Sequence, residues 1–206
     1  MQATLKGLYV VTPDWDDTDR LLAASDAALR GGAAVLQYRH KTADEALRRE
    51  QASQLLALCR RHGRPFIIND YPELCVELDA DGVHVGGTDA AVAAVRQQVG
   101  RERILGASCY GSLELAQAAQ AAGASYVAFG GFYPSRVKKY EVTTPVDIVS
   151  RARAAGVQLP SVVIGGMTRG NVQPLVAAGA DMVAVISSVY FADDPESAAR
   201  ELVGLF

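Results

Sequence analysis

The sequence has few cysteines, no membrane-length apolar run and no excess of positive charge. Its three cysteines, Cys59, Cys75 and Cys109, have neither metal-ligand nor redox spacing, which argues against a disulfide framework or a zinc site. The apolar runs are about as long as a strand, far short of the roughly 20 residues that cross a bilayer. A formal net charge of −3 gives no support to nucleic-acid or anionic-membrane binding. With no basic segment and apolar core at the N-terminus, we expect a soluble, reduced, cytoplasmic protein without membrane or nucleic-acid partners.

What the sequence does contain is a regular alternation of short apolar runs and helix-forming segments. Eight runs are expected to be strands: 8–11, 34–38, 66–69, 82–85, 104–108, 126–130, 161–165 and 182–187. Helical stripes cover 16–30, 44–61 and 113–122, and Asp44, Ser112 and Asn171 stand where N-caps belong. Small-residue turns (GGAA, DADG, AGAS and AGAD) end several helices and lead into the next strand.

This alternation predicts parallel strands joined by right-handed crossovers, which is an α/β fold. About eight such units in ~200 residues fit a compact (β/α)₈ TIM barrel. We find no linker or low-complexity segment and predict a single domain over residues 1–206. An open doubly wound sheet is the alternative, although VVTPDWD rather than a G-x-G-x-x-G loop follows the first strand. In a barrel the catalytic residues stand at the C-terminal ends of the strands, so polar residues there are the candidates.

The second strand run is followed by an amide and two cations at alternate positions, Gln37, Arg39 and Lys41. If the strand continues through them, these side chains share one face. A guanidinium and an ammonium together suit phosphate oxygens, which predicts an anion cradle. A salt-bridge network at the barrel mouth is the alternative.

Two carboxylates follow the third and fourth strands. Asn69 and Asp70 end the third strand, where Pro72 opens the next helix, and Asp89 lies just beyond the fourth. Each aspartate could cap a helix. Together, and next to a cationic cradle, they are suited to Mg²⁺, which takes a few carboxylate oxygens with substrate phosphates and water.

For the remaining nucleophilic and titratable residues, the sequence predicts hydrogen-bonding, packing or surface roles. Ser108 ends the fifth strand without an obvious Ser–His–Asp neighbourhood, so we expect a hydrogen-bond donor rather than a nucleophile. His84 lies within the fourth strand and is expected to be a packed core histidine. His40 and His62 are expected to face solvent, and Cys109 to be a packed small residue.

The ends of strands six to eight predict a second anion site. The irregular stretch 130–144, with its Gly pair, Pro134 and three basic residues, suits a mobile lid, or else an ordinary solvated loop. The Gly165–Gly166 pair after strand seven, and Ser187 or Ser188 after strand eight, suit a monophosphate held by backbone N–H and hydroxyl groups. A tight turn without ligand is the alternative.

At these strand ends the sequence resembles the thiamine-phosphate synthase family of compact (β/α)₈ enzymes. The resemblance runs nearly end to end and rests on LQYRHK, IIND, DGVHVGGTD, GAS, FGGFYPSRVKK, VIGGM and VAVISS, in family order. It implies a transferase that couples 4-amino-2-methyl-5-hydroxymethylpyrimidine diphosphate to a thiazole phosphate and releases pyrophosphate. It also implies Mg²⁺ as the cofactor and these two phosphorylated molecules as the partners.

The resemblance implies a role for each strand-end residue. The pyrimidine diphosphate would be held by Gln37, Arg39, Lys41, Asn69, Ser108 and Lys138. The thiazole phosphate would be held by Ser135, Arg136, Val137, Gly166, Ile186 and Ser187. Asp70 and Asp89 would hold Mg²⁺. Arg39, Lys41, Lys138 and Ser108 would serve catalysis, the cations by neutralising charge on the departing pyrophosphate in a dissociative displacement.

Two stretches depart from the family pattern. PSRVK replaces a P-T-x-T-K arrangement, so Val137 lacks a hydroxyl donor, and GGTD replaces GQED while keeping Asp89. These departures bear on substrate affinity and on the thiazole form used. Two other functions stay open: a thiazole tautomerase-like isomerase, although no histidine stands just after strand six, and a non-catalytic barrel that binds a phosphate ligand. Homo-oligomer formation also stays open.

Overall fold

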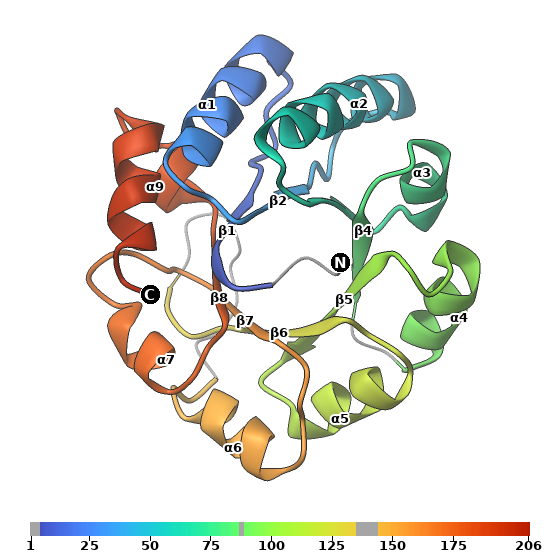
Figure 1. The fold of residues 1–206 in the computed structure, drawn as a ribbon, viewed down its shortest axis with the longest axis vertical. Helices are drawn as coiled ribbons and strands as arrows, with labels where there is room; N and C mark the ends of the chain where they lie inside the picture. The colour runs from blue at the N-terminus through green and yellow to red at the C-terminus, as the bar shows by residue number, and fades with distance from the viewer. Residues whose placement is uncertain (1–4, 87–88, 135–143) are drawn as a thin grey trace.

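The strands of the protein close into a barrel. The computed structural model describes residues 5–86, 89–134 and 144–206, and of residues 89 and 90 only the backbone. The strands are hydrogen-bonded in the order β1 to β8, and β8 pairs in parallel with β1. Helices surround this ring, as Figure 1 shows in a view along the barrel. The predicted TIM barrel is confirmed, and the open doubly wound sheet is wrong.

The elements alternate as the sequence predicts. The strands are β1 Gly7–Val11, β2 Val35–Tyr38, β3 Phe66–Asn69, β4 Gly82–Gly86, β5 Ile104–Tyr110, β6 Tyr126–Gly130, β7 Ser161–Ile164 and β8 Met182–Val185. The helices are α1 Thr18–Arg30, α2 Glu45–His62, α3 Pro72–Glu77, α4 Asp89–Val99, α5 Leu113–Ala121, α6 Ile148–Ala154, α7 Gln173–Ala177, α8 Ser187–Tyr190 and α9 Pro195–Val203. None of the helices in these described ranges is long and apolar enough to cross a membrane.

Two apolar cores hold the barrel together. The larger combines strand residues such as Leu8 and Leu36 with helix residues such as Leu21 and Leu55, so it fills the layer between sheet and helices. The smaller is built from strand residues alone and fills the barrel interior: Tyr9, Val11, Val35, Ile67, Tyr126, Ala128, Val162, Met182 and Ala184. The alternation of side chains along each strand separates the two cores.

Side-chain N-caps begin α1, α2, α5 and α9, and one predicted cap fails. The carboxylate of Asp44 accepts from the Leu47 N–H at 2.8 Å, and the hydroxyl of Ser112 accepts from the Leu115 N–H at 3.1 Å, so both predicted N-caps are confirmed. Asn171 was expected to cap the helix after strand seven, and this is wrong. Helix α7 begins later, and the Asn171 side chain instead accepts from the Thr168 N–H and donates to the Gly166 carbonyl, closing the loop.

The turns before the strands use left-handed backbone, as expected. Gly32, Gly123 and Gly179 have positive φ in GGAA, AGAS and AGAD. In DADG the left-handed residue is Asp79, with φ 52°, rather than the glycine. Aspartate tolerates this region better than most side chains, so the same turn forms without glycine.

Candidate active site

The strand β2 end carries a buried arginine held by a carboxylate from the β1 end. The Arg39 Nη1 lies 3.1 Å from the Asp14 Oδ1, and the Arg39 side chain is only 7 % exposed. The same Asp14 oxygen accepts from the Lys41 N–H at 2.9 Å. Thr12 binds both backbone groups of Arg39, accepting from its N–H and donating to its carbonyl. Arg39 is thus held by one ion pair, and no wider salt-bridge network includes Arg39 or Lys41 within the described ranges.

The three polar residues after β2 do not share one strand face. Strand β2 ends at Tyr38, as the predicted run 34–38 does, so Arg39 and Lys41 belong to the following turn and the condition for a shared face is not met. Gln37 is buried in the barrel interior, whereas Lys41 is exposed and has no ion pair within the described ranges. The turn folds this way because Asp14 accepts from the Lys41 N–H that a longer strand would give to its neighbour.

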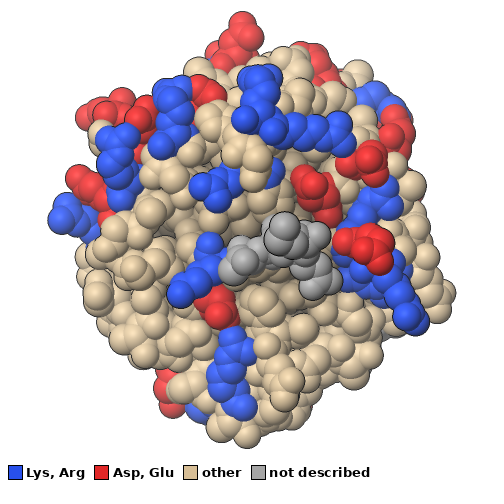
Figure 2. All heavy atoms as spheres, viewed as in Figure 1, with Lys and Arg blue, Asp and Glu red and all other residues tan. Residues whose placement is uncertain are grey.

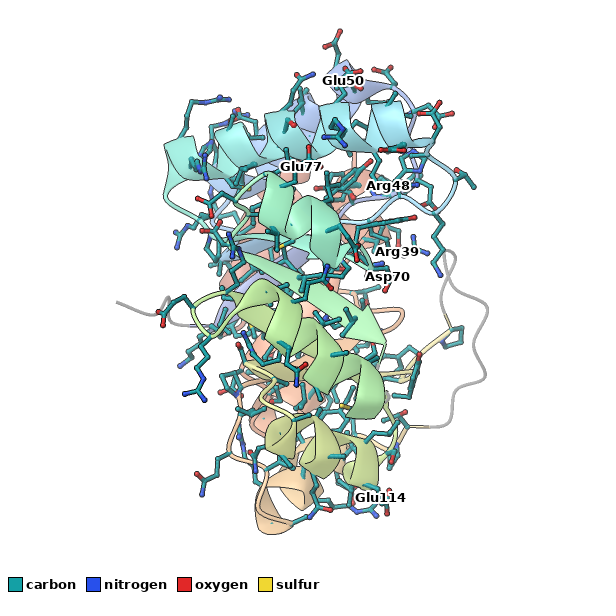
Figure 3. The ribbon with its side chains drawn as sticks, turned by 90° about the vertical axis from the view of Figure 1, so that its right-hand side faces the viewer. Arg39, Arg48, Glu50, Asp70, Glu77 and Glu114 are labelled. Atoms are coloured by element: carbon teal, nitrogen blue, oxygen red, sulfur yellow. The ribbon has the colours of Figure 1, made fainter. Side chains whose placement is uncertain are left out.

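Asp70 presents an exposed carboxylate beside the same turn. Figure 3 shows Arg39 and Asp70 at the same edge of the barrel, where β2 and its neighbour β3 end. Asp70 has φ 65°, and its N–H donates to the His84 carbonyl at 2.9 Å. The Asn69 amide donates to the Asp70 Oδ2 at 2.7 Å. Tyr71, not Asp70, occupies the N-cap position of α3, so the capping alternative for Asp70 is wrong.

The donor set at this edge suits Mg²⁺. Asp70 offers oxygen ligands that no cation in the described part of the chain neutralises, and strand β4 ends beside it at Gly86. Helix α4 begins at Asp89, whose side chain lies outside the described residues. In the described ranges no group of three or more His, Cys, Asp or Glu side chains could hold a metal. A site of one or two carboxylates completed by substrate phosphates and water matches this set.

A chain of polar side chains crosses the barrel interior and reaches Ser108. The Gln37 Nε2 donates to the Tyr9 Oη at 2.8 Å, and the Tyr9 and Tyr126 hydroxyls lie 2.7 Å apart. The His84 Nδ1 lies 2.9 Å from the Tyr126 Oη, and the His84 Nε2 lies 2.8 Å from the Ser108 Oγ. Burial raises the pKa of Tyr9 and of Tyr126 well above the ordinary value, so both phenols keep their protons.

This arrangement corrects one expectation about Ser108. A histidine does contact its hydroxyl, although the sequence suggested no such neighbour. Among the described residues, the hydroxyl at the other ring nitrogen of His84 is the Tyr126 phenol, and a phenol cannot stabilise an imidazolium as an aspartate does. The expected donor role of Ser108 is compatible with this geometry, and His84 is a packed interior histidine as expected.

The Gly165–Gly166 turn is tightly packed against the segment after β6. Gly166 has φ 63°, and a Cβ there would lie 2.4 Å from the Pro134 carbonyl oxygen. The Tyr133 N–H donates to the Gly165 carbonyl at 3.2 Å. Both glycines are therefore needed for the turn itself, whatever ligand it binds. Ser135, Arg136, Val137 and Lys138, and the rest of the predicted lid through 143, lie outside the described residues.

The β8 end lies next to the β7 turn. Ile186 precedes α8, whose first residue is Ser187, and both are half-buried. The Ser188 hydroxyl donates to the Met167 carbonyl, joining the two loops. Gly166, Ile186 and Ser187 are thus on adjacent loops at one edge of the barrel.

One histidine is placed differently from the expectation. His40 was expected to face solvent, but its side chain is fully buried, and its Nδ1 accepts from the Ala43 N–H at 3.1 Å. The Nε2 lies 3.1 Å from the Asp16 Oδ1. The turn between β2 and α2 folds over this ring, which no periodicity in the sequence indicates. His62 is half-buried and lies 2.8 Å from Asp26.

The opposite end of the barrel carries a broad hollow that has a structural explanation. Figure 2 views this end, where Lys and Arg gather beside acidic side chains. The hollow of about 1380 Å³ is lined by the loops that lead into the strands. One of its arginines, Arg96, donates to the carbonyl oxygens of Gly100, Arg103 and Gly123. These bonds close loops, and in barrels of this kind the active site lies at the other end.

Sequence reasoning missed Asp14, Thr12 and the two interior tyrosines. A carboxylate in VVTPDWD, directly after the first strand, was a usable signal for Asp14 because all strand ends meet at one edge. Nothing local indicated that Tyr9 and Tyr126 meet, because 117 residues separate them.

Comparison with known proteins identifies the family. The family model described as thiamine monophosphate synthase matches residues 8–189. A thiamine-phosphate synthase of Janthinobacterium sp. (strain Marseille) is 65% identical over 206 residues, covering 100% of this chain and 99% of the relative. One from Chromobacterium violaceum is 49% identical with the same coverage. The solved thiamine phosphate pyrophosphorylase from Pyrococcus furiosus superposes with a TM-score of 0.85 at 29% identity, covering 100% of this chain and 97% of that one.

The family model, the full-length relatives and the solved structure agree with one another and with the barrel fold. The chain therefore belongs to the thiamine monophosphate synthase family and is a transferase of thiamine biosynthesis.

Proposed function

We propose that the enzyme couples 4-amino-2-methyl-5-hydroxymethylpyrimidine diphosphate to a thiazole phosphate, giving thiamine phosphate and pyrophosphate. The observation that carries this proposal is the edge where β2 and β3 end. A buried guanidinium, an exposed ammonium and an exposed carboxylate, those of Arg39, Lys41 and Asp70, stand there together. A diphosphate leaving group requires cations that bind its phosphate oxygens. It also requires an oxygen ligand for the divalent ion that accompanies it.

The reaction we propose is a dissociative displacement. The CH₂ that bears the diphosphate is attached to an electron-rich aminopyrimidine, which can stabilise positive charge at that carbon. The C–O bond to the diphosphate breaks first, and the thiazole nitrogen then supplies the electron pair for the new C–N bond. Arg39, Lys41 and Lys138 stabilise the negative charge that grows on the leaving pyrophosphate.

Asp70 and Asp89 would hold Mg²⁺ in this scheme. When bound, the ion supplies further neutralisation of the diphosphate oxygens. Asn69 supports the site by donating to the Asp70 carboxylate, which keeps one carboxylate oxygen turned away from the asparagine and available.

The second anion site, on the loops after β7 and β8, would hold the thiazole phosphate. We propose that Gly166, Ile186 and Ser187, on the adjacent β7 and β8 loops, contact that phosphate together with Ser135, Arg136 and Val137. Gly166 and Ser187 are half-buried, so a ligand can reach them. The absence of a hydroxyl at Val137 makes the choice between plain and carboxylated thiazole phosphate a property to be measured.

A coupling assay tests the proposal. The enzyme is mixed with the pyrimidine diphosphate and either thiazole phosphate, with Mg²⁺ or with a chelator, and both thiamine phosphate and pyrophosphate are measured. We expect equal amounts of the two products, formed only with both substrates and Mg²⁺. Isomerisation of the thiazole without pyrophosphate release would favour a tautomerase. Ligand binding without any product would favour a non-catalytic barrel.

A further inference from the structure

Two residues that the proposed function places on the pyrimidine substrate, Gln37 and Ser108, are joined through the barrel interior. The connection runs through Tyr9, Tyr126 and His84, which belong to three other strands, β1, β6 and β4. Every hydrogen bond in it is between 2.7 and 2.9 Å long. The donor and the acceptor of each hydrogen bond follow from those of the bond before it, beginning at Gln37.

The first half of the chain runs from Gln37 to Tyr126. The Gln37 amide donates to the Tyr9 oxygen, so the Tyr9 proton must go to another acceptor. Within the described part of the chain, the Tyr126 oxygen is the one acceptor in reach of that proton. Both phenols are about 99 % buried, and a buried O–H without an acceptor is costly. Tyr9 therefore donates to Tyr126.

The second half sets the tautomer of His84. The Tyr126 proton, in turn, has the His84 Nδ1 as its acceptor at 2.9 Å. A ring nitrogen that accepts carries no proton, so the neutral imidazole carries its proton on Nε2. That N–H donates to the Ser108 Oγ at 2.8 Å. The Ser108 hydroxyl then has its own proton left for a ligand, and Ser108 is half-buried rather than sealed.

A glycine makes the central contact possible. Gly106 lies between His84 and Tyr126 in the sheet, paired with both. A Cβ on Gly106 would lie 2.1 Å from the Tyr126 Cζ and 2.5 Å from the His84 Nδ1. With no side chain there, the two rings stack at 5.6 Å with an angle of 22° between them. The approach of Tyr126 to His84 thus depends on a specific residue of the sheet.

We propose that His84 is a positioning residue that, with Tyr126 and Tyr9, determines which groups of the substrate pocket donate hydrogen bonds and which accept them. Ser108 is set as a donor, and the Gln37 carbonyl oxygen, which has no partner within the described ranges, is left as an acceptor. The pocket then selects a molecule with an N–H donor toward β2 and an acceptor toward β5, as a phosphorylated aminopyrimidine offers. The selectivity part of this inference rests on the proposed function.

The tautomer of His84 can be measured without any substrate. Long-range ¹H–¹⁵N NMR spectra distinguish the two neutral tautomers, and the His84→Gln variant assigns the signal among the three histidines. We expect the Nε2–H tautomer in the wild-type protein and a mixture of tautomers in Tyr126→Phe. An Nδ1–H tautomer or an imidazolium in the wild type, or an unchanged tautomer in Tyr126→Phe, would overturn the proposal.

Steady-state kinetics then test the positioning role. Glutamine at position 84 places an amide N–H near the former Nε2, whereas leucine fills similar space without a donor. We expect His84→Leu to raise the KM for the pyrimidine diphosphate about tenfold and to leave the KM for the thiazole phosphate unchanged. His84→Gln should restore most of the loss. Equal kinetics in the two variants, or equal changes in both KM values, would overturn the positioning role.

These outcomes are separable from failure of the proposed function. If the wild-type protein forms no coupled product, the proposed function fails, while the NMR measurement still decides the direction of the hydrogen bonds. If coupling proceeds and the tautomer is Nδ1–H, the proposed function stands and this inference fails.

Discussion

The Arg39 guanidinium and the Asp14 carboxylate form an ion pair that joins the ends of β1 and β2, with 3.1 Å between Nη1 and Oδ1. The pair orients a nearly buried cation toward the edge where Lys41 and Asp70 also lie. Because Asp14 also accepts from the Lys41 N–H, one carboxylate positions both cationic residues of the candidate site.

Asp14→Asn should weaken both the fold and the site. The variant leaves Arg39 without its charged partner, and we expect a loss of about 1.5–3 kcal/mol in the free energy of unfolding, a value typical of a hydrogen bond to a charged group. The KM for the pyrimidine diphosphate should rise because Arg39 and the Lys41 turn lose their anchor. Urea unfolding and initial rates check these effects. Asp193→Asn, on the exposed surface, is the control, and a similar small effect from both would contradict the assignment.

Asp70→Asn should change the dependence on Mg²⁺ rather than stability. Asparagine tolerates the left-handed backbone of this position, so the fold is kept while the charge is lost. We expect the Mg²⁺ concentration for half-maximal rate to rise by about tenfold or more, because losing even a group that only supports a metal ligand typically costs that much. Asp79→Asn is a matched control, since Asp79 has φ 52° and lies in the DADG turn before β4. A Mg²⁺ titration that is unchanged in Asp70→Asn would remove this residue from the metal site.

Lys138→Ala should reduce turnover sharply and leave the fold intact. Removing one preorganised charge at a developing anion typically costs about a hundredfold or more in kcat. The neighbouring Lys139→Ala provides the control, with turnover expected within about threefold of wild type because the family resemblance assigns Lys139 no contact with the leaving pyrophosphate. Pyrophosphate release and circular dichroism measure the two properties. Near-normal turnover of Lys138→Ala would withdraw its catalytic assignment.

Gly166→Ala should disturb the turn after β7. The added Cβ would lie 2.4 Å from the Pro134 carbonyl oxygen in left-handed backbone, so the 132–134 segment must move. We expect a loss of about 1–3 kcal/mol in unfolding free energy, as for other strained backbone positions, and a higher KM for the thiazole phosphate. Gly170→Ala is the control in the same loop, because a Cβ there meets only the Thr168 Oγ1, at 3.9 Å. Equal stability of the two variants would show that the turn relaxes.

The buried thiols predict a loss of stability in alkaline solution. Burial raises the pKa of Cys59 to about 12 and that of Cys75 to about 11, from an ordinary value of 9.0. Unfolded thiols therefore ionise at a lower pH than folded ones, and stability present below pH 9 is lost as the pH rises toward 11. For Cys75 the loss by pH 10 is about 1 kcal/mol.

Urea unfolding at pH 8 and pH 10 measures this effect. The wild-type protein should lose more stability between the two values than Cys75→Ala does. The cavity in the variant lowers stability equally at both pH values, so only the difference reports ionisation. The same pH dependence in both proteins would show that the Cys75 thiol ionises alike in the folded and unfolded states.

Much of the architecture was predictable because it depends on local patterns. Eight short apolar runs separated by helical stripes are enough for the order of elements, and their number favours a closed barrel over the open doubly wound sheet. Asp44 and Ser112 were found as caps because a cap is a contact over three residues. Asn171 was misplaced because the same residue type also closes loops, and only the surrounding backbone decides between the two.

The candidate site was predictable to the same extent. Arg39, Asp70, Ser108 and Gly166 were expected at the strand ends, and they lie there because parallel strands bring their C-terminal ends to one edge. The Asp14–Arg39 pair and the burial of His40 were not found. They depend on how two loops fold over each other, for which the sequence has no periodic signal.

The sequence by itself determined the alternation of strands and helices, the family resemblance and the polar residues at the strand ends, because all of these follow from local order along the chain. Only the tertiary structure decided that Tyr9, Tyr126 and His84 form one hydrogen-bonded connection to Ser108. The physical reason is that barrel closure and strand register bring together side chains more than a hundred residues apart, and a shift of one residue would turn each of them to the opposite face.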